Sequence, residues 1–229
     1  SDLDKEYILT AKLGESTNTY DSEGTIIKKI DLSNIKLEIE DIERTIQKFI
    51  GIIEQVPPMY SAIKNQGIPL YKLARKGLEI ERKPRTVTIN SIEILDFNLP
   101  FLSLKVSCSK GTYIRSLCND IGNALGTGAH IVELMRTRIG HFSIDDSARI
   151  SELPTKTSAL YSIDSALKHI QEMKIEGDNL KKAKNGNPVN LKSGDIPHSL
   201  IRMKDPEGRL FGIGKVSKGF VKIERLFNL

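Results

Sequence analysis

The sequence predicts an α+β protein, in which a mixed, largely antiparallel sheet with flanking helices is followed by a small β-rich module. Strand-like and helical patterns are intermixed over most of the chain, and several strands adjoin through hairpin-like connections. This arrangement favours a mixed sheet over a doubly wound parallel one. From about residue 177 short strands alternate with turns such as GNP and PEG. We therefore expect domains at residues 1–172 and 173–229.

The elements of the first half follow from periodicity and from turn residues. Pro57 and Pro58 lack the N–H donor and push the residue before them into an extended conformation, so VPPMYSAIKNQG at 56–67 is expected to be irregular. The other expected elements are a strand over 7–14, a polar loop over 15–24, an extended segment over 25–30 and a helix over 39–50 that Gly51 ends.

The second half contains the helix that raises the question of function. Five apolar side chains between Ile114 and Leu125 form one face of a helix over 112–125, and Gly126 ends it. Yet the polar side chains of Tyr113 and Arg115 stand in its first turn. The other expected elements are a short helix over 69–77, strands over 86–95 and 102–109, a further turn of helix over 129–135, a strand over 136–144 and a helical pattern over 162–170.

Composition favours a binding partner with negative charge. The net charge is +5 and the pI is about 9.1, and nucleic acid is the commonest anionic partner of such proteins. No apolar run approaches the ~20 residues of a membrane span, and the N-terminus does not resemble a signal peptide. Cys108 and Cys118 form no metal-ligand pattern and are expected to be small buried side chains in a reducing cytosol. The four histidines are scattered singly, so we expect no metal.

Tyrosine, lysine and arginine side chains gather in the expected loops and element ends. Aromatic rings can stack on bases while cations hold phosphates, which suits single-stranded or flipped nucleotides. Each residue taken alone could equally be a solvated surface charge or a half-buried tyrosine. The residues are Tyr7, Tyr60, Lys64, Tyr71, Arg75, Arg85, Lys110, Tyr113 and Arg115.

Three long segments, in order, resemble the bacterial TruB family, the synthases that make pseudouridine at position 55 in the TΨC loop of tRNA. They are KEYILTAKLGESTNTYDSEG from residue 5, QVPPMYSAIKNQGIPLYKLARKG from residue 55 and CSKGTYIRSLCNDIGNALGTGAHIVELMRTRIG from residue 108. KNGNPV and the tail after it resemble the small PUA-like RNA-binding domain that ends these enzymes. The resemblance implies a pseudouridine-synthase sheet over 1–172 and a PUA-like domain over 173–229.

The resemblance also implies a mechanism without cofactor or metal. The uridine is flipped out of its loop, an aspartate acts as nucleophile, the glycosidic bond breaks and the base is rejoined through C5. Tyr7 matches the residue that stacks on the base and is the candidate to remove the C5 proton. Arg115 matches the partner of the catalytic aspartate, and Tyr113 matches a residue that hydrogen-bonds at that centre.

Other positions match residues that surround the RNA. Leu134 matches a side chain near the base, Lys64 and Arg75 match contacts to the tRNA backbone, and Asp21 matches a polar residue near the RNA. We add Tyr60 and Lys110, which stand in the same matched segments. The expected partner is therefore the T-arm stem-loop of tRNA, and the family leads us to expect a cytoplasmic monomer.

The chain departs from the family in two places. Asn18 stands where the family commonly has aspartate in T-D-T, and the G-x-L-D motif that carries the nucleophile does not occur in the sequence. SDLD at residues 1–4 lacks the glycine, and Asp2 and Asp4 are expected to be solvated chain-end residues. Asp120 is expected to be a polar surface or packing residue. We therefore expect the nucleophile to lie outside this polypeptide.

Three explanations of that departure stay open. The chain is a fragment of a normal enzyme, or a cleaved enzyme that keeps its N-terminal piece bound, or a protein that lost catalysis and kept RNA binding. The presence of Tyr7, Tyr113 and Arg115 favours the first two, and on either of them the chain alone is expected to be inactive. The alternative function is thus a catalytically silent tRNA-binding or tRNA-folding protein. A basic α+β protein that binds no RNA is the third possibility.

Overall fold

The chain forms two compact units, Ser1–Ser147 and Ala148–Leu229. The computed structural model describes residues 3–153, 155, 160–190, 199–217 and 219–227. The break between the units falls earlier than the expected domain boundary between residues 172 and 173. The reason is that a short helix and a strand within 163–174 are bonded to the C-terminal sheet, as described below.

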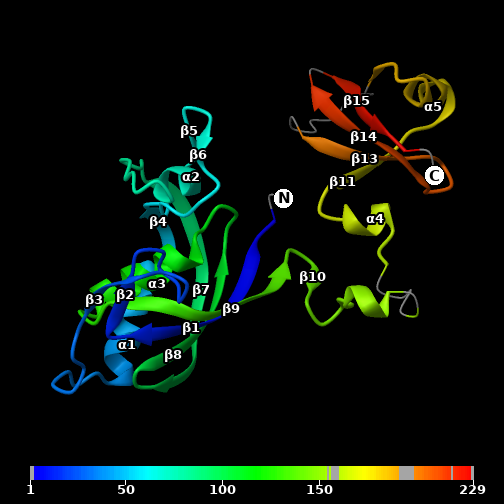
Figure 1. The fold of residues 1–229 in the computed structure, drawn as a ribbon. Coiled ribbons are helices and arrows are strands. Elements are labelled where there is room, and N and C mark those ends of the chain that lie inside the picture. Colours follow the sequence, from blue (N-terminus) through cyan, green and yellow to red (C-terminus); the bar gives the residue numbers. More distant parts are fainter. Residues whose placement is uncertain (1–2, 154, 156–159, 191–198, 218, 228–229) are drawn as a thin grey trace. The chain divides into compact units, whose positions relative to one another are not determined.

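A six-stranded antiparallel sheet forms the body of the N-terminal unit, in the order β10-β9-β1-β8-β7-β4 (Figure 1). This confirms the expected mixed α+β class with a largely antiparallel sheet. The strands are β1 (Lys5–Leu13), β4 (Gly51–Gln55), β7 (Arg85–Asn98), β8 (Phe101–Cys108), β9 (Ala129–Ile139) and β10 (Phe142–Ser143).

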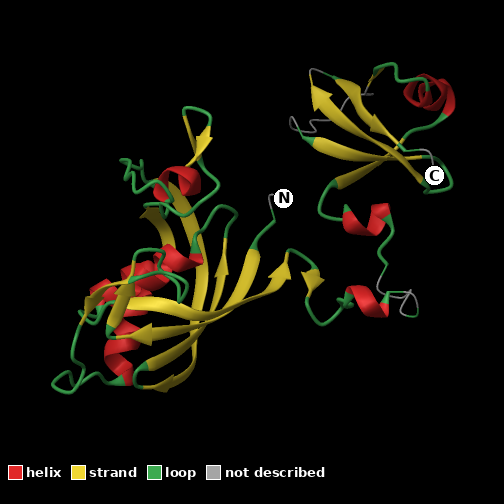
Figure 2. Ribbon diagram, viewed as in Figure 1, coloured by secondary structure: helices red, strands yellow, loops and turns green. Residues whose placement is uncertain are grey.

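The core lies between this sheet and two helices, α1 (Ile39–Ile46) and α3 (Ile114–Ala124) (Figure 2). Strand β8 alternates along its length, and every second side chain is buried. The apolar face of α3 covers the sheet as its periodicity predicts. The buried core side chains of β8 and α3 are Leu102, Leu104, Val106, Cys108, Ile114, Leu117, Cys118 and Ile121.

Both cysteines are buried, as expected from the sequence. Burial raises the pKa of the Cys118 thiol to about 12. Burial likewise raises the pKa of Cys108. Neither thiol is therefore prepared for nucleophilic chemistry.

The expected helical turn at 129–135 is wrong, because this segment is the first part of β9. Helix α3 ends at Gly126, whose φ of 76° is left-handed. The N–H of Gly128 then closes the turn on the carbonyl oxygen of Gly122 at 2.8 Å. Residues 129–139 pair with the whole length of β1 and cover its second edge. An apolar run of this length does not distinguish a buried strand from a helix, and the pairing with β1 decides it.

Gly122 permits this close approach of strand to helix. A Cβ built on Gly122 would lie 2.4 Å from the backbone nitrogen of Ala129, which is closer than real Cβ contacts come. The glycine inside an otherwise regular helix thus has a packing reason.

Several other elements are shorter than expected. A 3₁₀ turn, Gln47–Phe49, follows α1 before Gly51 (φ 100°), α2 spans only Leu70–Ala74, and α4 is a single turn, Ile163–Ala166. Residues 56–63 are irregular, as the two prolines predict. The remaining strands of this unit form the hairpins β2–β3 (Glu15–Thr17, Ile26–Lys29) and β5–β6 (Lys64–Asn65, Ile68–Pro69).

The C-terminal unit contains a five-stranded sheet in the order β11-β13-β14-β15-β12. The prediction of a small β-rich module is therefore confirmed. Strand β11 runs parallel to β13, and the other neighbours are antiparallel. The elements are β11 (Gln171–Lys174), α5 (Gly177–Lys184), β12 (Val189–Asn190), β13 (Leu200–Lys204), β14 (Leu210–Ser217) and β15 (Phe220–Leu226).

A four-residue ion cluster joins α4 to this sheet. Arg202 is buried on β13 and donates to the backbone oxygen of Ile170 at 2.8 Å and to the Asp164 carboxylate. Lys204 binds Asp164 at 2.8 Å and Glu172 at 2.9 Å. Burial raises the pKa of Asp164, but hydrogen bonds from Lys204 and Arg202 lower it by more, so it lies below its usual range. The hydrogen bond from Lys204 also lowers the pKa of Glu172.

We expect this cluster to make the C-terminal unit sensitive to acid. A carboxyl group whose pKa is lowered on folding stabilises the protein above its ordinary pKa, and the stabilisation is lost as the pH falls through the lower value. The urea midpoint, followed by NMR signals of β13, should therefore fall between about pH 5 and about pH 2. A midpoint that stays constant over this range would contradict the assignment.

Candidate functional site

Arg115, in the first turn of α3, joins two segments that are far apart in the sequence. Its Nη1 donates to Asp21 Oδ2 at 2.7 Å and to the carbonyl oxygen of Thr19 at 3.2 Å. Its Nη2 donates to the carbonyl oxygen of Tyr60 at 2.7 Å. The side chains of the Arg115–Asp21 pair are 27% and 23% exposed, so the pair is shielded more than a surface ion pair but remains accessible.

The guanidinium keeps capacity for another anion. An arginine has five N–H donors. Within the described part of the chain, the contacts to Thr19, Asp21 and Tyr60 use three of them. The remaining two can donate to a second carboxylate or to a phosphate, and the N-terminus of the helix favours negative charge at the same place.

Asp21 is held in position by its own loop. Thr19 Oγ1 donates to Asp21 Oδ1 at 2.6 Å, and Thr17 Oγ1 donates to the Asp21 backbone oxygen at 2.7 Å. Both threonines are buried. Tyr20 adopts a left-handed backbone conformation (φ 64°), and its carbonyl oxygen accepts from Ile131 on β9. The polar loop expected at 15–24 is thus an ordered support for one carboxylate.

Gln55 fixes the start of α3 from the other side. It is fully buried at the end of β4, and its side chain binds both backbone groups of Tyr113. The N–H of Tyr113 donates to Gln55 Oε1 at 2.8 Å, and Gln55 Nε2 donates to the Tyr113 oxygen at 3.1 Å. Ser116 Oγ adds a bond to the Val56 oxygen at 3.1 Å. The irregular segment after β4 is therefore bonded to the helix turn that presents Arg115.

Replacing Gln55 by alanine should destabilise the N-terminal unit by about 2 kcal/mol, because the Tyr113 N–H loses its partner and the buried Gln55 side chain is removed, whereas the Tyr113 oxygen keeps its bond from the Leu117 N–H. Gln47→Ala, at an exposed position of the 3₁₀ turn, is the matched control and should change stability by less than about 0.5 kcal/mol. Urea unfolding measures both. Equal effects of the two substitutions would show that the Gln55 bonds contribute nothing specific.

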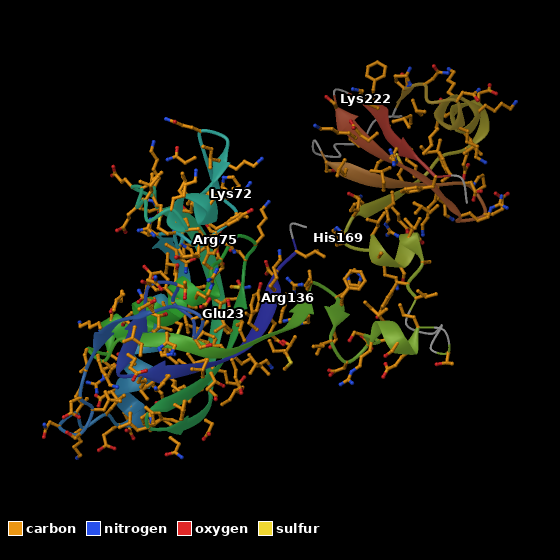
Figure 3. All side chains as sticks on the ribbon, in the orientation of Figure 1. Glu23, Lys72, Arg75, Arg136, His169 and Lys222 are labelled. Carbon is orange, nitrogen blue, oxygen red and sulfur yellow. The ribbon has the colours of Figure 1, made fainter. Side chains whose placement is uncertain are left out.

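The other residues predicted around the base lie on β1, on its neighbour β9 and in the turn before α3. Tyr7 is half-buried on β1, packs against the core and has Arg136 of β9 as its register partner. Leu134 is exposed on β9 and is paired in register with Leu9. Lys110 is exposed in the turn before α3, and Figure 3 labels Arg136 beside β1.

Two predicted residues lie apart from Arg115, on an arm that we define as residues 57–85. The β5–β6 hairpin and α2 of this arm project beyond the sheet (Figure 1). Lys64 is exposed on β5, and Arg75 caps α2 with its guanidinium 5.5 Å from the centre of the Tyr71 ring. Figure 3 shows Arg75 and Lys72 on this projecting part.

The carboxylates weighed from the sequence have different surroundings. Asp4 is exposed and accepts a hydrogen bond from Asn90 at 3.0 Å, whereas Asp2 lies outside the described residues. Asp120 is half-buried on α3, and burial raises its pKa. The carboxylate that binds Arg115 is Asp21, a pairing the sequence did not predict.

The described residues contain no group of three or more His, Cys, Asp and Glu side chains that could hold a metal ion. Nor does any helix among them have the length and apolar character needed to cross a bilayer. His130 is buried, and its Nδ1 lies 3.1 Å from the Glu15 backbone oxygen.

Comparison with known sequences gives the family. Residues 1–114 match the model of the TruB family pseudouridylate synthase N-terminal domain, and residues 115–171 match that of the tRNA pseudouridylate synthase B C-terminal domain. The chain is 40% identical over 223 residues to the tRNA pseudouridine synthase B of Dechloromonas aromatica, a match that covers 95% of this chain and 73% of that protein. The chain belongs to the TruB family.

A second TruB relative agrees. The tRNA pseudouridine synthase B of Clostridium kluyveri is 43% identical over 228 residues, and the match covers 97% of this chain and 78% of that protein. The chain of a crystal structure of a Cbf5-Nop10-Gar1 complex superposes with a TM-score of 0.71 at 21% identity, covering 98% of this chain and 67% of that one. At this identity the likeness concerns the fold, which is thus shared between the two proteins.

Membership of the TruB family suggests which group the unused donors of Arg115 would bind. TruB proteins are isomerases that act on uridine, and the family resemblance assigns to Arg115 the pairing of a catalytic aspartate. Asp21, Thr19 and Tyr60 accept from three of the five N–H groups of Arg115, and the other two are the donors that could bind such an aspartate. Three side chains that hold the site, Gln55, Thr17 and Thr19, were not singled out from the sequence. Their side chains are uncharged, and a glutamine or threonine alone does not indicate a catalytic or binding role.

Proposed function

We propose that this protein isomerises uridine 55 in the T-loop of tRNA to pseudouridine, with its nucleophile on a G-x-L-D segment outside these 229 residues. The observation that supports this most is the Arg115 guanidinium, which is fixed by three acceptors and retains two donors at a helix N-terminus. A second carboxylate placed there would be positioned and kept ionised by the cation beside it.

In this proposal each of the described site residues has a separate role in the reaction. The aspartate oxygen bonds to C1′ as the bond from C1′ to N1 breaks, and the base leaves as an anion and turns. C5 then bonds to C1′ and displaces the aspartate, after which C5 loses its proton and N1 gains one. Arg115 orients the aspartate and Asp21 orients Arg115. Tyr7 stacks on the flipped base and takes the C5 proton, while Tyr113 hydrogen-bonds at the same centre and Leu134 packs near the base.

The arm and the turn before α3 bind the RNA outside the reacting nucleotide. We propose that Lys64 and Arg75 contact the RNA backbone, and that Tyr60, Lys110 and Asp21 lie against the bound RNA. The β-rich C-terminal unit acts as a PUA-like RNA-binding domain from residue 173 onward. The protein works as a monomer in the cytoplasm, without cofactor or metal.

Binding of a T-arm stem-loop tests the RNA part of the proposal. The chain should bind it more tightly than an arbitrary duplex of equal length, and the affinity should fall steeply with salt, because phosphate contacts release counterions. Tyr7→Ala should weaken capture of the T-loop and leave duplex binding unchanged. Equal affinity for the T-arm and the duplex would contradict the proposal.

The second candidate function is a catalytically silent tRNA-binding or tRNA-folding protein. The exposed cations Lys64 and Arg75 on the arm support it, because they could bind RNA without any nucleophile. T-arm binding is common to both candidates, and only the isomerisation assay described at the end of the Discussion separates them.

A further inference from the structure

The base of the arm contains a cavity with an excess of positive charge. It has a volume of about 260 Å³ and lies next to the irregular segment after β4. Its lining includes four basic side chains, one carboxylate and an apolar floor that includes Pro57 and Leu70. The charged residues are Lys64, Glu81, Arg82, Lys83 and Arg85.

Arg82 is the fixed member of this group. Its side chain is 17% exposed, its Nη1 donates to the carbonyl oxygen of Pro57 at 3.2 Å, and its Nη2 binds Glu79 at 3.2 Å. The Nε of Arg82 is buried and has no hydrogen-bond partner in the described structure. A buried donor without a partner is unfavourable, so Arg82 gains if an oxygen anion draws its guanidinium toward the cavity.

The other cations carry charge that no described carboxylate neutralises. Among the described residues, Lys64, Lys83 and Arg85 form no ion pair. Lys64 comes from the β5–β6 hairpin, whereas Lys83 and Arg85 come from the end of the arm where β7 begins. The arm therefore gathers like charges around one small cavity, an arrangement that a bound anion stabilises.

We propose that this cavity is a phosphodiester-binding subsite for the RNA backbone, formed by Arg82, Lys83, Arg85 and Lys64. This inference rests on the proposed function, because the anion is taken to be a phosphate of bound RNA. A guanidinium beside exposed ammonium groups suits a phosphate, since the arginine supplies a planar set of donors and the lysines add charge. The subsite also explains why residues 82–85, the irregular end of the arm and the first residue of β7, are basic, which the expected contacts at Lys64 and Arg75 leave unexplained.

The test compares charge-neutralising variants in binding to the T-arm stem-loop over a range of salt. Lys83→Gln and Arg85→Gln should each reduce the slope of log affinity against log salt by about one and weaken binding to T-arm and duplex RNA alike. Lys48→Gln removes an exposed charge beyond the opposite end of β4 and should leave the slope unchanged. Arg82→Lys keeps the charge but loses the planar donors, and should weaken RNA binding about tenfold at temperatures where thermal melting shows the variant to be fully folded.

The outcomes separate this subsite from the proposed function. If the parent chain binds the T-arm but Lys83→Gln and Arg85→Gln leave its slope unchanged, the subsite is overturned and the proposed function stands. If the slope falls equally for Lys48→Gln, the effect is net charge and the subsite is again overturned. If the parent chain does not prefer the T-arm, the proposed function itself fails.

Discussion

Arg115→Ala is expected to reduce uridine isomerisation by about 10²- to 10³-fold in a protein that carries the G-x-L-D aspartate, the usual loss when one positioned charged donor is removed. The substitution removes the guanidinium that binds Asp21, Thr19 and Tyr60, so the loop and the arm also lose their common anchor. Arg115→Lys keeps the charge but cannot supply the same fork of donors, and most of the loss should remain.

A double-mutant cycle separates the ion pair from the backbone contacts. Asp21→Ala and Arg115→Ala should show a coupling free energy of about 1–2 kcal/mol in urea unfolding, because the pair is shielded and supported by Thr19. The matched control is the Arg44–Asp41 pair on α1, which has the same 2.7 Å separation but is 73% and 43% exposed. Its coupling should be about 0.5 kcal/mol or less. Equal coupling in the two pairs would contradict the role given to Asp21.

Arg202→Ala is expected to destabilise the C-terminal unit by about 2–3 kcal/mol, because a buried side chain and its bonds to the Ile170 oxygen and to Asp164 are lost, while Lys204 still pairs with Asp164 and Glu172. Arg202 contacts Asp164, the Ile170 oxygen and Glu172, and its side chain is only 8% exposed. The residue thus fixes α4 and β11 to β13. Such a loss is a large fraction of the stability of a typical small domain, so the C-terminal unit should open much more often.

The readout for Arg202→Ala is amide exchange of β13 and β14. Exchange in the N-terminal sheet reports separately on the other unit. Lys181→Ala, which removes an exposed ion pair with Asp178 on α5, is the control and should leave exchange unchanged. Protection of β13 that survives in Arg202→Ala would show that the ion cluster does not hold the unit together.

The secondary structure was predictable where the hydrophobic periodicity of a segment alone distinguished a strand from a helix. The alternation of 102–109 and the apolar face of 114–125 predicted β8 and α3, because each buries one regular face. Residues 129–135 were predicted wrongly, since a short apolar run has no period of its own and its state is decided by pairing with β1. Residues 163–174 join the C-terminal unit through the pairing of β11 with β13 and through the bonds of the buried Arg202, and no local sequence pattern predicts either contact.

In the arrangement around Arg115, the sequence drew attention to two residues but not to their partners. Tyr113 and Arg115 were conspicuous because they stand in the first turn of a core helix. The partner of Arg115 was not, because Asp21 is 94 positions away in the sequence and only the fold brings them together. Gln55 could not be identified as the support of Tyr113 from its neighbours, since a buried amide at a strand end looks like any polar residue before a proline turn.

The release of tritium from a T-arm stem-loop labelled at C5 of uridine 55 tests the central claim most directly, because pseudouridine formation must detach that hydrogen. The protein would be assayed with the G-x-L-D segment of a TruB relative joined to its N-terminus, and again with that aspartate replaced by asparagine. We expect stoichiometric release with the aspartate, none with the asparagine, and equal RNA binding by both. Tight T-arm binding without release in either form would contradict the enzyme assignment and leave a tRNA-binding protein.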